Sequence, residues 1–218
     1  MQLSYPLRIF FFFCLFYIAA CTQASILTNP GVTLPPVQEI PKPSAKAIEL
    51  NDQAVTTFLN AHIEKNMDGI HQSLKLLDEA VQVDPQYYQA YATKAGLLMD
   101  MQRYSEAVES FSKALQIKPS VGEFYIGRAS ALHKAGDETK AKEDCRFAIA
   151  AFNLRLAKNP EDSSRIDRAI AVFLLGYKKV ALGEVIEILK KNPHDEVAQM
   201  VKTFIESGQD PWLIFDQS

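Results

Sequence analysis

Apolar residues recur at helical spacing from about Lys46 to Ser207, and no stretch alternates apolar and polar residues as a half-buried strand would. The clearest segment is Tyr88–Val121. Small residues there alternate with bulky ones, as two closely packed helices require, and Pro119 follows the second helix, where it cannot continue the hydrogen-bonded turns. The small residues are Ala95, Ala107 and Ala114, and the bulky ones are Tyr91, Leu98, Tyr104 and Phe111.

The pattern repeats on both sides of this segment. One segment length downstream, the residues repeat the pattern with Gly136-Asp137 at the turn between the two helices. One segment length upstream, they repeat the second half of the pattern. The repeated positions are Tyr125, Ala129, Leu132, Ala141, Cys145 and Ala148 downstream, and Leu77, Ala80 and Pro85 upstream. A fourth, degenerate copy has Ala169, Val172, Gly176, Ala181, Val185, Ile188 and Pro193 near the expected places.

Prolines keep the same period. Pro85 and Pro119 are one segment length apart, and the interval from Pro160 to Pro193 is shorter by a single residue. The interval from Pro119 to Pro160 is seven residues longer than the first of these. The third copy is therefore predicted to have a second helix lengthened by about two turns. The first helix of the first copy is off register by about one residue, with its apolar positions at Val55, Phe58, Leu59 and Ile63.

These positions resemble the tetratricopeptide (TPR) repeat, because Tyr91, Ala95, Leu98, Ala107, Phe111, Ala114 and Pro119 all fall in register. The resemblance implies an all-α fold, a TPR-like superhelical stack of antiparallel helix hairpins with about four units, the first and last degenerate. A terminal helix at residues 194–207 is expected to cap the last unit. The repeat domain is therefore placed at residues 48–207.

In TPR proteins the first helix of each repeat lines a concave groove, and the resemblance implies that this groove binds another protein here. Gly96 and Ala92 would leave room for a bound backbone, and Met99 would offer an adaptable apolar contact. Chaperone-binding TPR proteins carry a clamp of Lys and Asn on the groove face. Here Ala92, Gly96, Met99, Glu123 and Gly127 occupy that region, which argues against that role. The candidate groove residues are Phe58, His62, Lys65, Asn66, Gln89, Ala92, Gly96, Met99, Asp100, Glu123, Ile126, Ser130, His133 and Lys134.

The chain begins with a predicted targeting segment, residues 1–20. Arg8 precedes the apolar run Ile9–Ala20, which is too short to span a bilayer as a helix. The run ends in Ala19-Ala20-Cys21, which resembles the bacterial lipobox, so cleavage before Cys21 and acylation of its thiol and amine, with palmitate among the acyl chains, are expected. Thr22 stands where Asp would resemble an inner-membrane retention signal, so the resemblance favours the outer membrane. A plain secretory signal cleaved near Ala20 or Ala24 is the alternative.

Two flanking segments lie outside the repeats. Residues 21–47 carry five prolines and are predicted to be an extended tether that holds the helical domain several tens of ångströms off the membrane. The tail at residues 208–218 contains Trp212, the only tryptophan, followed by three apolar residues. We expect the tail to fold back on the terminal helices, and the alternative is that it binds a partner or lies in the protein's own groove.

Composition excludes several function classes. The net charge is −3 with interspersed signs, so no basic stripe argues for nucleic acid. Catalytic motifs are missing, and the four histidines lack metal-ligand spacing, so we expect no enzyme activity, no cofactor and no metal. Of three cysteines, Cys145 is predicted to be a buried structural thiol. Carboxylates such as Glu106, Glu109, Glu143 and Asp144 are predicted to lie at solvated helix positions.

Three hypotheses for function remain. The first is a TPR lipoprotein on the periplasmic side of the outer membrane, anchored by its N-terminal lipid, that acts as an adaptor for an envelope protein. The second is an immunity protein that neutralises a toxin delivered into the periplasm by type VI secretion, such as a phospholipase or a peptidoglycan hydrolase. The third is an enzyme or small-ligand receptor, for which no residues can be assigned. A homodimer through terminal helices is possible in the first two cases.

Overall fold

The fold is a row of paired helices. The structure, a computed structural model, describes residues 25–216. Within this range it has nine α-helices, two short 3-10 helices and no strand. The elements are η1 (Ser25–Leu27), α2 (Ala45–Glu64), α3 (Met67–Val83), α4 (Tyr88–Asp100), α5 (Tyr104–Ile117), α6 (Gly122–Lys134), α7 (Glu138–Lys158), α8 (Asp162–Leu174), α9 (Lys178–Lys191), α10 (Glu196–Ser207) and η2 (Pro211–Asp216).

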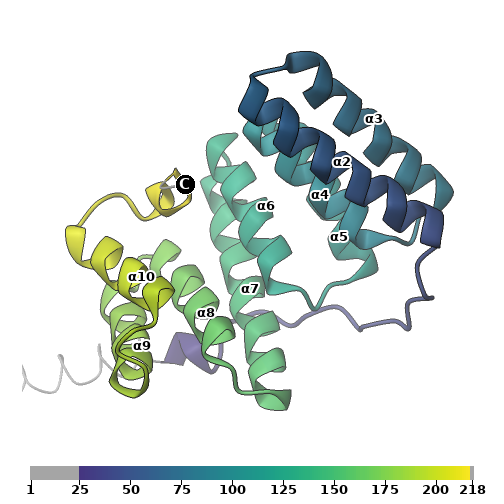
Figure 1. Ribbon diagram of the computed structural model, residues 1–218. Coiled ribbons are helices and arrows are strands. Elements are labelled where there is room, and N and C mark those ends of the chain that lie inside the picture. The colour runs from purple at the N-terminus through teal and green to yellow at the C-terminus, as the bar shows by residue number, and fades with distance from the viewer. Residues whose placement is uncertain (1–24, 217–218) are drawn as a thin grey trace, which may run out of the picture.

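The helices form four hairpins in sequence order, α2 with α3, α4 with α5, α6 with α7 and α8 with α9 (Figure 1). The helix α10 packs on α8 and α9 and closes the row. Along the row, the first helix of each hairpin contacts the first helix of the next, so α2, α4, α6, α8 and α10 share one side of the molecule. This arrangement confirms the predicted stack of four hairpins with a terminal helix.

Each hairpin turns through one residue with a positive φ angle. These residues are Lys65 and Gln102 at φ 54° and 58°, and Gly136 and Gly176, both at 89°. Gln102 and Gly136 are one repeat length apart, so the turn has the period of the repeat. Glycine is the residue that adopts this conformation without steric strain, and the two glycine turns are those of the third and fourth hairpins.

The third hairpin has the long second helix that the proline spacing predicts. The helix α7 has 21 residues, whereas α5 and α9 have 14 each. The difference of seven residues is about two turns, as predicted. Its side chains Cys145, Ile149 and Phe152 are fully buried, and Cys145 is a free thiol whose pKa burial raises well above its ordinary value. The prediction of a buried structural cysteine is therefore confirmed.

The first helix is present, but most of the large apolar side chains by which the sequence placed it are not in the core. Val55, Leu59 and Ile63 point into solvent, and Ile63 is 79% exposed. The buried side of α2, which packs against α3, instead carries small residues such as Ala54 and Ala61. A Cβ atom built on Gly69 of α3 would lie only 2.6 Å from the Ala61 Cβ atom, so the two helices pack there nearly backbone to backbone.

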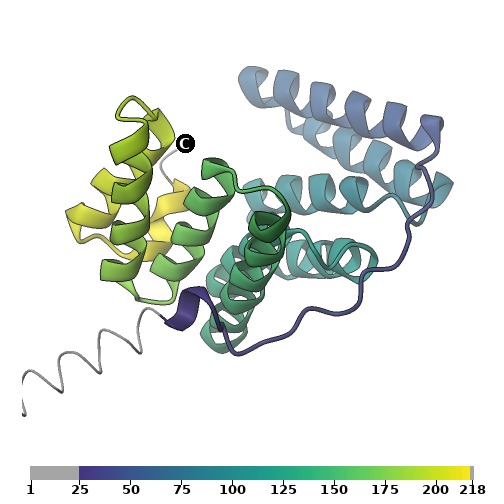
Figure 2. The same ribbon diagram turned by 90° about the horizontal axis from the view of Figure 1, so that it is seen from below.

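The proline-rich residues 25–44, the N-terminal segment, do not stand away from the domain as a spacer. The segment starts at η1 beside α7 and runs along one side of the row to the start of α2 (Figure 2). The Ile26 side chain is buried in the core of the third and fourth hairpins. At the other end, the Ser44 amide donates to Asp84 at 2.8 Å. The segment therefore lies against the domain at both of its ends.

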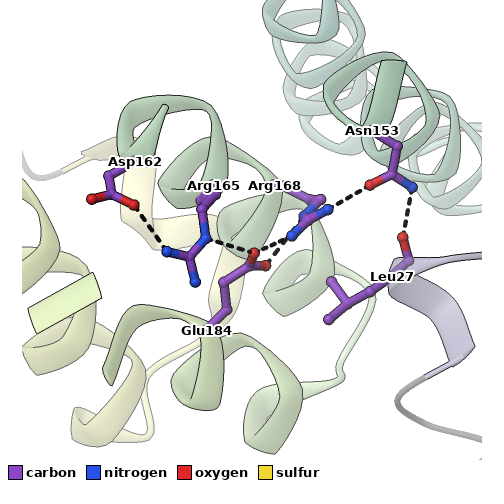
Figure 3. Close-up of polar contacts among 6 residues, drawn as sticks. All are labelled: Leu27, Asn153, Asp162, Arg165, Arg168 and Glu184. Carbon is purple, nitrogen blue, oxygen red and sulfur yellow. Dashed lines mark hydrogen bonds and ion pairs between the residues drawn. The ribbon is translucent and has the colours of Figure 1, made fainter. Parts of the chain in front are cut away.

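A chain of polar contacts joins the N-terminal segment to the fourth hairpin (Figure 3). The Asn153 amide donates to the Leu27 carbonyl at 2.6 Å and accepts from Arg168 at 2.6 Å. Arg168 also binds both carboxylate oxygens of Glu184, and Arg165 lies 3.6 Å from the same carboxylate. Glu184 is buried, so these cations replace the water that its charge would otherwise require.

The same ion pair occurs one hairpin earlier. Arg128 of α6 donates to both oxygens of Asp144 on α7, at 2.8 and 2.7 Å. Asp144 is buried, and this burial raises its pKa above its ordinary value although the hydrogen bonds from Arg128 oppose the shift. The prediction that Asp144 lies at a solvated position is therefore wrong, because an arginine 16 residues earlier compensates its burial.

Candidate functional site

A pocket of about 630 Å³ opens between α4 and α6 on the side shared by the first helices. Five of the predicted groove residues line it: Gly96, Met99, Asp100, Ser130 and Lys134. The remaining lining comes from Leu97, Gln102, Tyr104, Gly127 and Phe215. A Cβ atom built on Gly96 would meet nothing within 4 Å, so the pocket is open above the backbone of α4.

The first hairpin extends this surface through two aromatic rings. The Phe58 and His62 rings lie 5.7 Å apart on α2. His62 is close enough to Asp100 to act on it electrostatically: burial raises the pKa of the Asp100 carboxyl above its ordinary value, and His62 opposes that shift. Phe58, His62 and the lining of the pocket thus form one surface across the first three hairpins, which we call the groove.

Other predicted residues serve the fold. Asn66 caps α3, where its side-chain oxygen accepts from the amides of Asp68 and Gly69 at 3.1 and 3.3 Å. Lys65 is the exposed turn residue before it. Ile126 is buried in the core of the third and fourth hairpins. Ala92 is half-buried on α4, and Gln89 faces a separate pocket that the proline-rich N-terminal segment lines with Ile40, Pro41, Lys42 and Pro43.

Glu123 also lies apart from the groove pocket, in a charged cluster. Arg155 donates to both of its carboxylate oxygens, at 2.5 and 2.7 Å. Burial by itself would raise the pKa of Glu123, but the hydrogen bonds from Arg155 lower it below its ordinary value. Nearby Asp167 has no such hydrogen bond from Arg155, and burial, together with the charge of Glu123, raises its pKa to about 6.

At pH 7 the variant Asp167→Asn should have a free energy of unfolding about 1–2 kcal/mol above that of the wild-type chain. The folded wild-type chain carries an ionised, half-buried Asp167 carboxylate next to Glu123 at this pH, and the substitution removes its charge. The folded pKa of about 6 lies above the ordinary value of 3.8, so wild-type stability falls as the pH rises through this window. Urea denaturation at several pH values measures this, and the advantage of the variant should vanish near pH 4. Parallel pH profiles for the two chains would contradict the assignment.

His133, another predicted groove residue, is covered by the tail of the chain. The Trp212 ring stacks on the His133 ring with a centroid distance of 4.4 Å and an interplanar angle of 6°. Trp212 is only 6% exposed, so the tail does fold back on the protein, but its ring lies on α6 of the third hairpin and not only on the terminal helices. This position agrees in part with the alternative that the tail lies in the protein's own groove. The tail reaches α6 and α8 as well as α10, which places it on the groove side of the row.

Two kinds of feature were not found in the described part of the chain. Residues 25–216 contain no group of three or more His, Cys, Asp or Glu side chains that could hold a metal ion. None of the helices described between residues 25 and 216 is long and apolar enough to cross a membrane. Cys21 and the apolar run Ile9–Ala20 lie outside the described residues.

Residues 88–121, which comprise α4, α5 and the connection to α6, match the family model described as "Tetratricopeptide repeat". A tetratricopeptide repeat spans residues 88–121. The chain is similar in structure to a thermophilic TPR protein from Thermus thermophilus, for which a crystal structure is known. The TM-score is 0.55 at 16% identity, over 75% of this chain and 82% of that chain. This similarity shows that the four hairpins have the TPR fold.

Curated relatives share parts of the TPR array. The chain is 24% identical over 116 residues to Protein STIP1 homolog of Dictyostelium discoideum, a match over 52% of this chain and 21% of that protein. It is 25% identical over 126 residues to Hsp70-Hsp90 organizing protein 1 of Glycine max, over 58% of this chain and 22% of that protein. The chain thus spans about a fifth of the length of these two relatives.

Proposed function

We propose that this chain is a protein-binding TPR scaffold that holds a segment of a partner protein in the groove. The observation that carries the proposal is the open pocket between α4 and α6, lined by five residues that the repeat pattern assigns to the groove. Its wall combines the apolar Met99 and Leu97 with the charged Asp100 and Lys134, so it suits a peptide with both apolar and polar groups. The names of the relatives, which include an Hsp70-Hsp90 organizing protein, support an assembly role.

A bulky side chain at Gly96 tests this function. The variant Gly96→Leu should weaken partner binding at least tenfold, because the new side chain projects into the pocket and meets no described atom within 4 Å of its Cβ. The variant Gly183→Leu is the matched control: Gly183 is also exposed with open space around it, but it lies on α9, the second helix of its hairpin. Both substitutions should stabilise their helices by about 0.5–1 kcal/mol.

The measurement is quantitative capture from a cell-envelope extract by each purified variant, followed by titration with the captured protein. Loss of capture by Gly96→Leu alone supports the groove as the binding surface. Equal capture by both variants would show that partners bind elsewhere, and no specific capture by the wild-type chain would contradict the scaffold function itself.

We further propose that Cys21 carries a lipid and that the chain faces the periplasm from the outer membrane. Cys21 is four residues from Ser25, so an extended connection would reach at most about 14 Å. Because η1 is fixed against α7, the lipid would hold the third and fourth hairpins near the membrane. The domain would therefore sit close to the membrane and not at the end of a long spacer.

Metabolic labelling with an alkyne fatty acid tests the anchor. The variant Cys21→Ser should lose the label and leave the membrane fraction, because the thiol that forms the thioether is gone. Cys14→Ser, which changes a cysteine inside the apolar run, should keep both. A label that survives in Cys21→Ser, or a wild-type chain without a label, would refute the anchor.

A further inference from the structure

Residues 209–216, which we call the C-terminal segment, return from the end of the row to its inner side. The helix α10 ends at Ser207, and Gly208 follows with a φ angle of 75°, which redirects the chain. The 3-10 helix η2 then contacts α6, α8 and α10 (Figure 1). Of these, α6 and α8 are the first helices of the third and fourth hairpins, and α6 also lines the groove.

One aromatic ring fixes the segment. Trp212 lies flat on His133 and joins a cluster of buried side chains from three helices. The His133 Nδ1 atom lies 2.7 Å from the Glu138 carboxylate, and a hydrogen bond there holds the plane of the imidazole for a flat partner. The other buried members of this cluster are Ala129, Leu132, Ala141, Cys145 and Leu174.

The rest of the segment fits less closely. Leu213 is 41% exposed, and Phe215 forms one edge of the groove pocket without filling it. A second hollow of about 330 Å³ remains between Ile214 and the α10 side chains Met200 and Phe204. Ile214 and Phe215 are partly buried against the two neighbouring core clusters. A segment that buries one ring fully and the next side chains only in part resembles a bound peptide more than a completed core.

We propose that the groove continues past its edge at Phe215 to His133, and that it binds a short peptide whose aromatic side chain stacks on His133 and is followed by apolar residues. The C-terminal segment is then a displaceable copy of this peptide. The inference rests on the proposed scaffold function and names the partner's chemistry. A flat ring is required because the stack is nearly parallel, and apolar neighbours are required by the surrounding wall. Attachment to α10 gives the segment a high effective concentration, so it occupies the site until a tighter partner segment displaces it.

The first test uses a fluorescein-labelled peptide with the sequence of residues 209–218 and measures fluorescence anisotropy. The chain truncated after Gly208 and the full-length variant Trp212→Ala should both bind this peptide at least tenfold more tightly than the wild-type chain, in which the site is occupied. A peptide with Trp212→Ala should not bind. A peptide with Gln209→Ala should bind normally, because Gln209 is exposed and is not one of the apolar residues that follow the ring.

The second test follows displacement in the intact wild-type chain. Trp212 is the only tryptophan, so its emission reports whether the indole is buried. An excess of an unlabelled peptide with Trp212→Phe should displace the segment and shift this emission towards that of an exposed indole. An unlabelled peptide with Trp212→Ala should leave the emission unchanged.

Several results would overturn the proposal. These are equal peptide binding by wild-type and truncated chains, no binding to a folded variant, or loss of the folded state in both variants, which would make the segment part of the core. Each differs from failure of the scaffold function, which appears only as lack of partner capture by the wild-type chain. If the peptide fails but Gly96→Leu still abolishes capture, the function stands and only the partner's chemistry is wrong.

Discussion

Truncation of one phenylalanine should remove a large part of the stability of the whole array. The variant Phe152→Ala is expected to lower the free energy of unfolding by about 3–5 kcal/mol, because the side chain is fully buried and its removal leaves a cavity. The ring packs directly over Gly122 at the start of α6, where a built Cβ atom would lie 2.6 Å from it. Domains of this size are stable by only about 5–15 kcal/mol, so the loss should be visible in any denaturation experiment.

Leu154→Ala is the matched control for this prediction. Leu154 lies two residues further along the same helix but is exposed to solvent, so its truncation should cost less than about 1 kcal/mol. Urea denaturation followed by circular dichroism gives both values. Similar losses for the two variants would mean that the two added turns of α7 do not bury Phe152 against α6.

Removal of Arg168 should destabilise the chain by about 3 kcal/mol. Arg168→Ala leaves the buried Glu184 carboxylate with only Arg165, at 3.6 Å, and also frees the Asn153 oxygen. The expected loss is at the low end for a buried pair, because water still reaches part of the Arg168 side chain. Since Asn153 holds the Leu27 carbonyl, amide hydrogen exchange of the N-terminal segment should accelerate in the same variant.

Arg103→Ala provides the comparison. Arg103 also donates two hydrogen bonds to one carboxylate, that of Glu106, but both side chains are exposed and three residues apart on the chain. Its removal should cost less than about 1 kcal/mol and leave exchange of the N-terminal segment unchanged. Equal destabilisation by the two substitutions would show that burial of Glu184 does not decide the strength of the Arg168 pair.

The middle of the fold was predictable because its information is local. Two helices that pack against each other need small residues at fixed intervals, so the segment Tyr88–Val121 defines its own hairpin, and the step of one repeat length defines the neighbours. The proline spacing also gave the longer α7, because a helix must end before each proline. The pocket residues followed from the same register, since equivalent positions of successive first helices face the same side.

The ends of the chain were harder, because their burial depends on distant residues. An apolar stripe such as Val55, Leu59 and Ile63 marks a helix, but the first helix has a neighbour on one side only, and small alanines face it. The burial of Asp144 was missed although a signal existed, namely an arginine 16 residues earlier in the third hairpin that recurs in the fourth. The C-terminal segment has no periodicity that could indicate which helices it meets.

The burial of Ile26 constrains the order in which the parts of the chain can fold. Ile26 belongs to a core cluster that also contains Ile149 and Ile166, and the Leu27 carbonyl accepts a hydrogen bond from the Asn153 side chain, 126 residues further on. Residues 25–27 are therefore synthesised early, but the surface that they pack against does not exist until the third and fourth hairpins have been synthesised and folded. Closing so long a loop is slow relative to forming a hairpin, so residues 25–27 should be the last of the described residues to become ordered.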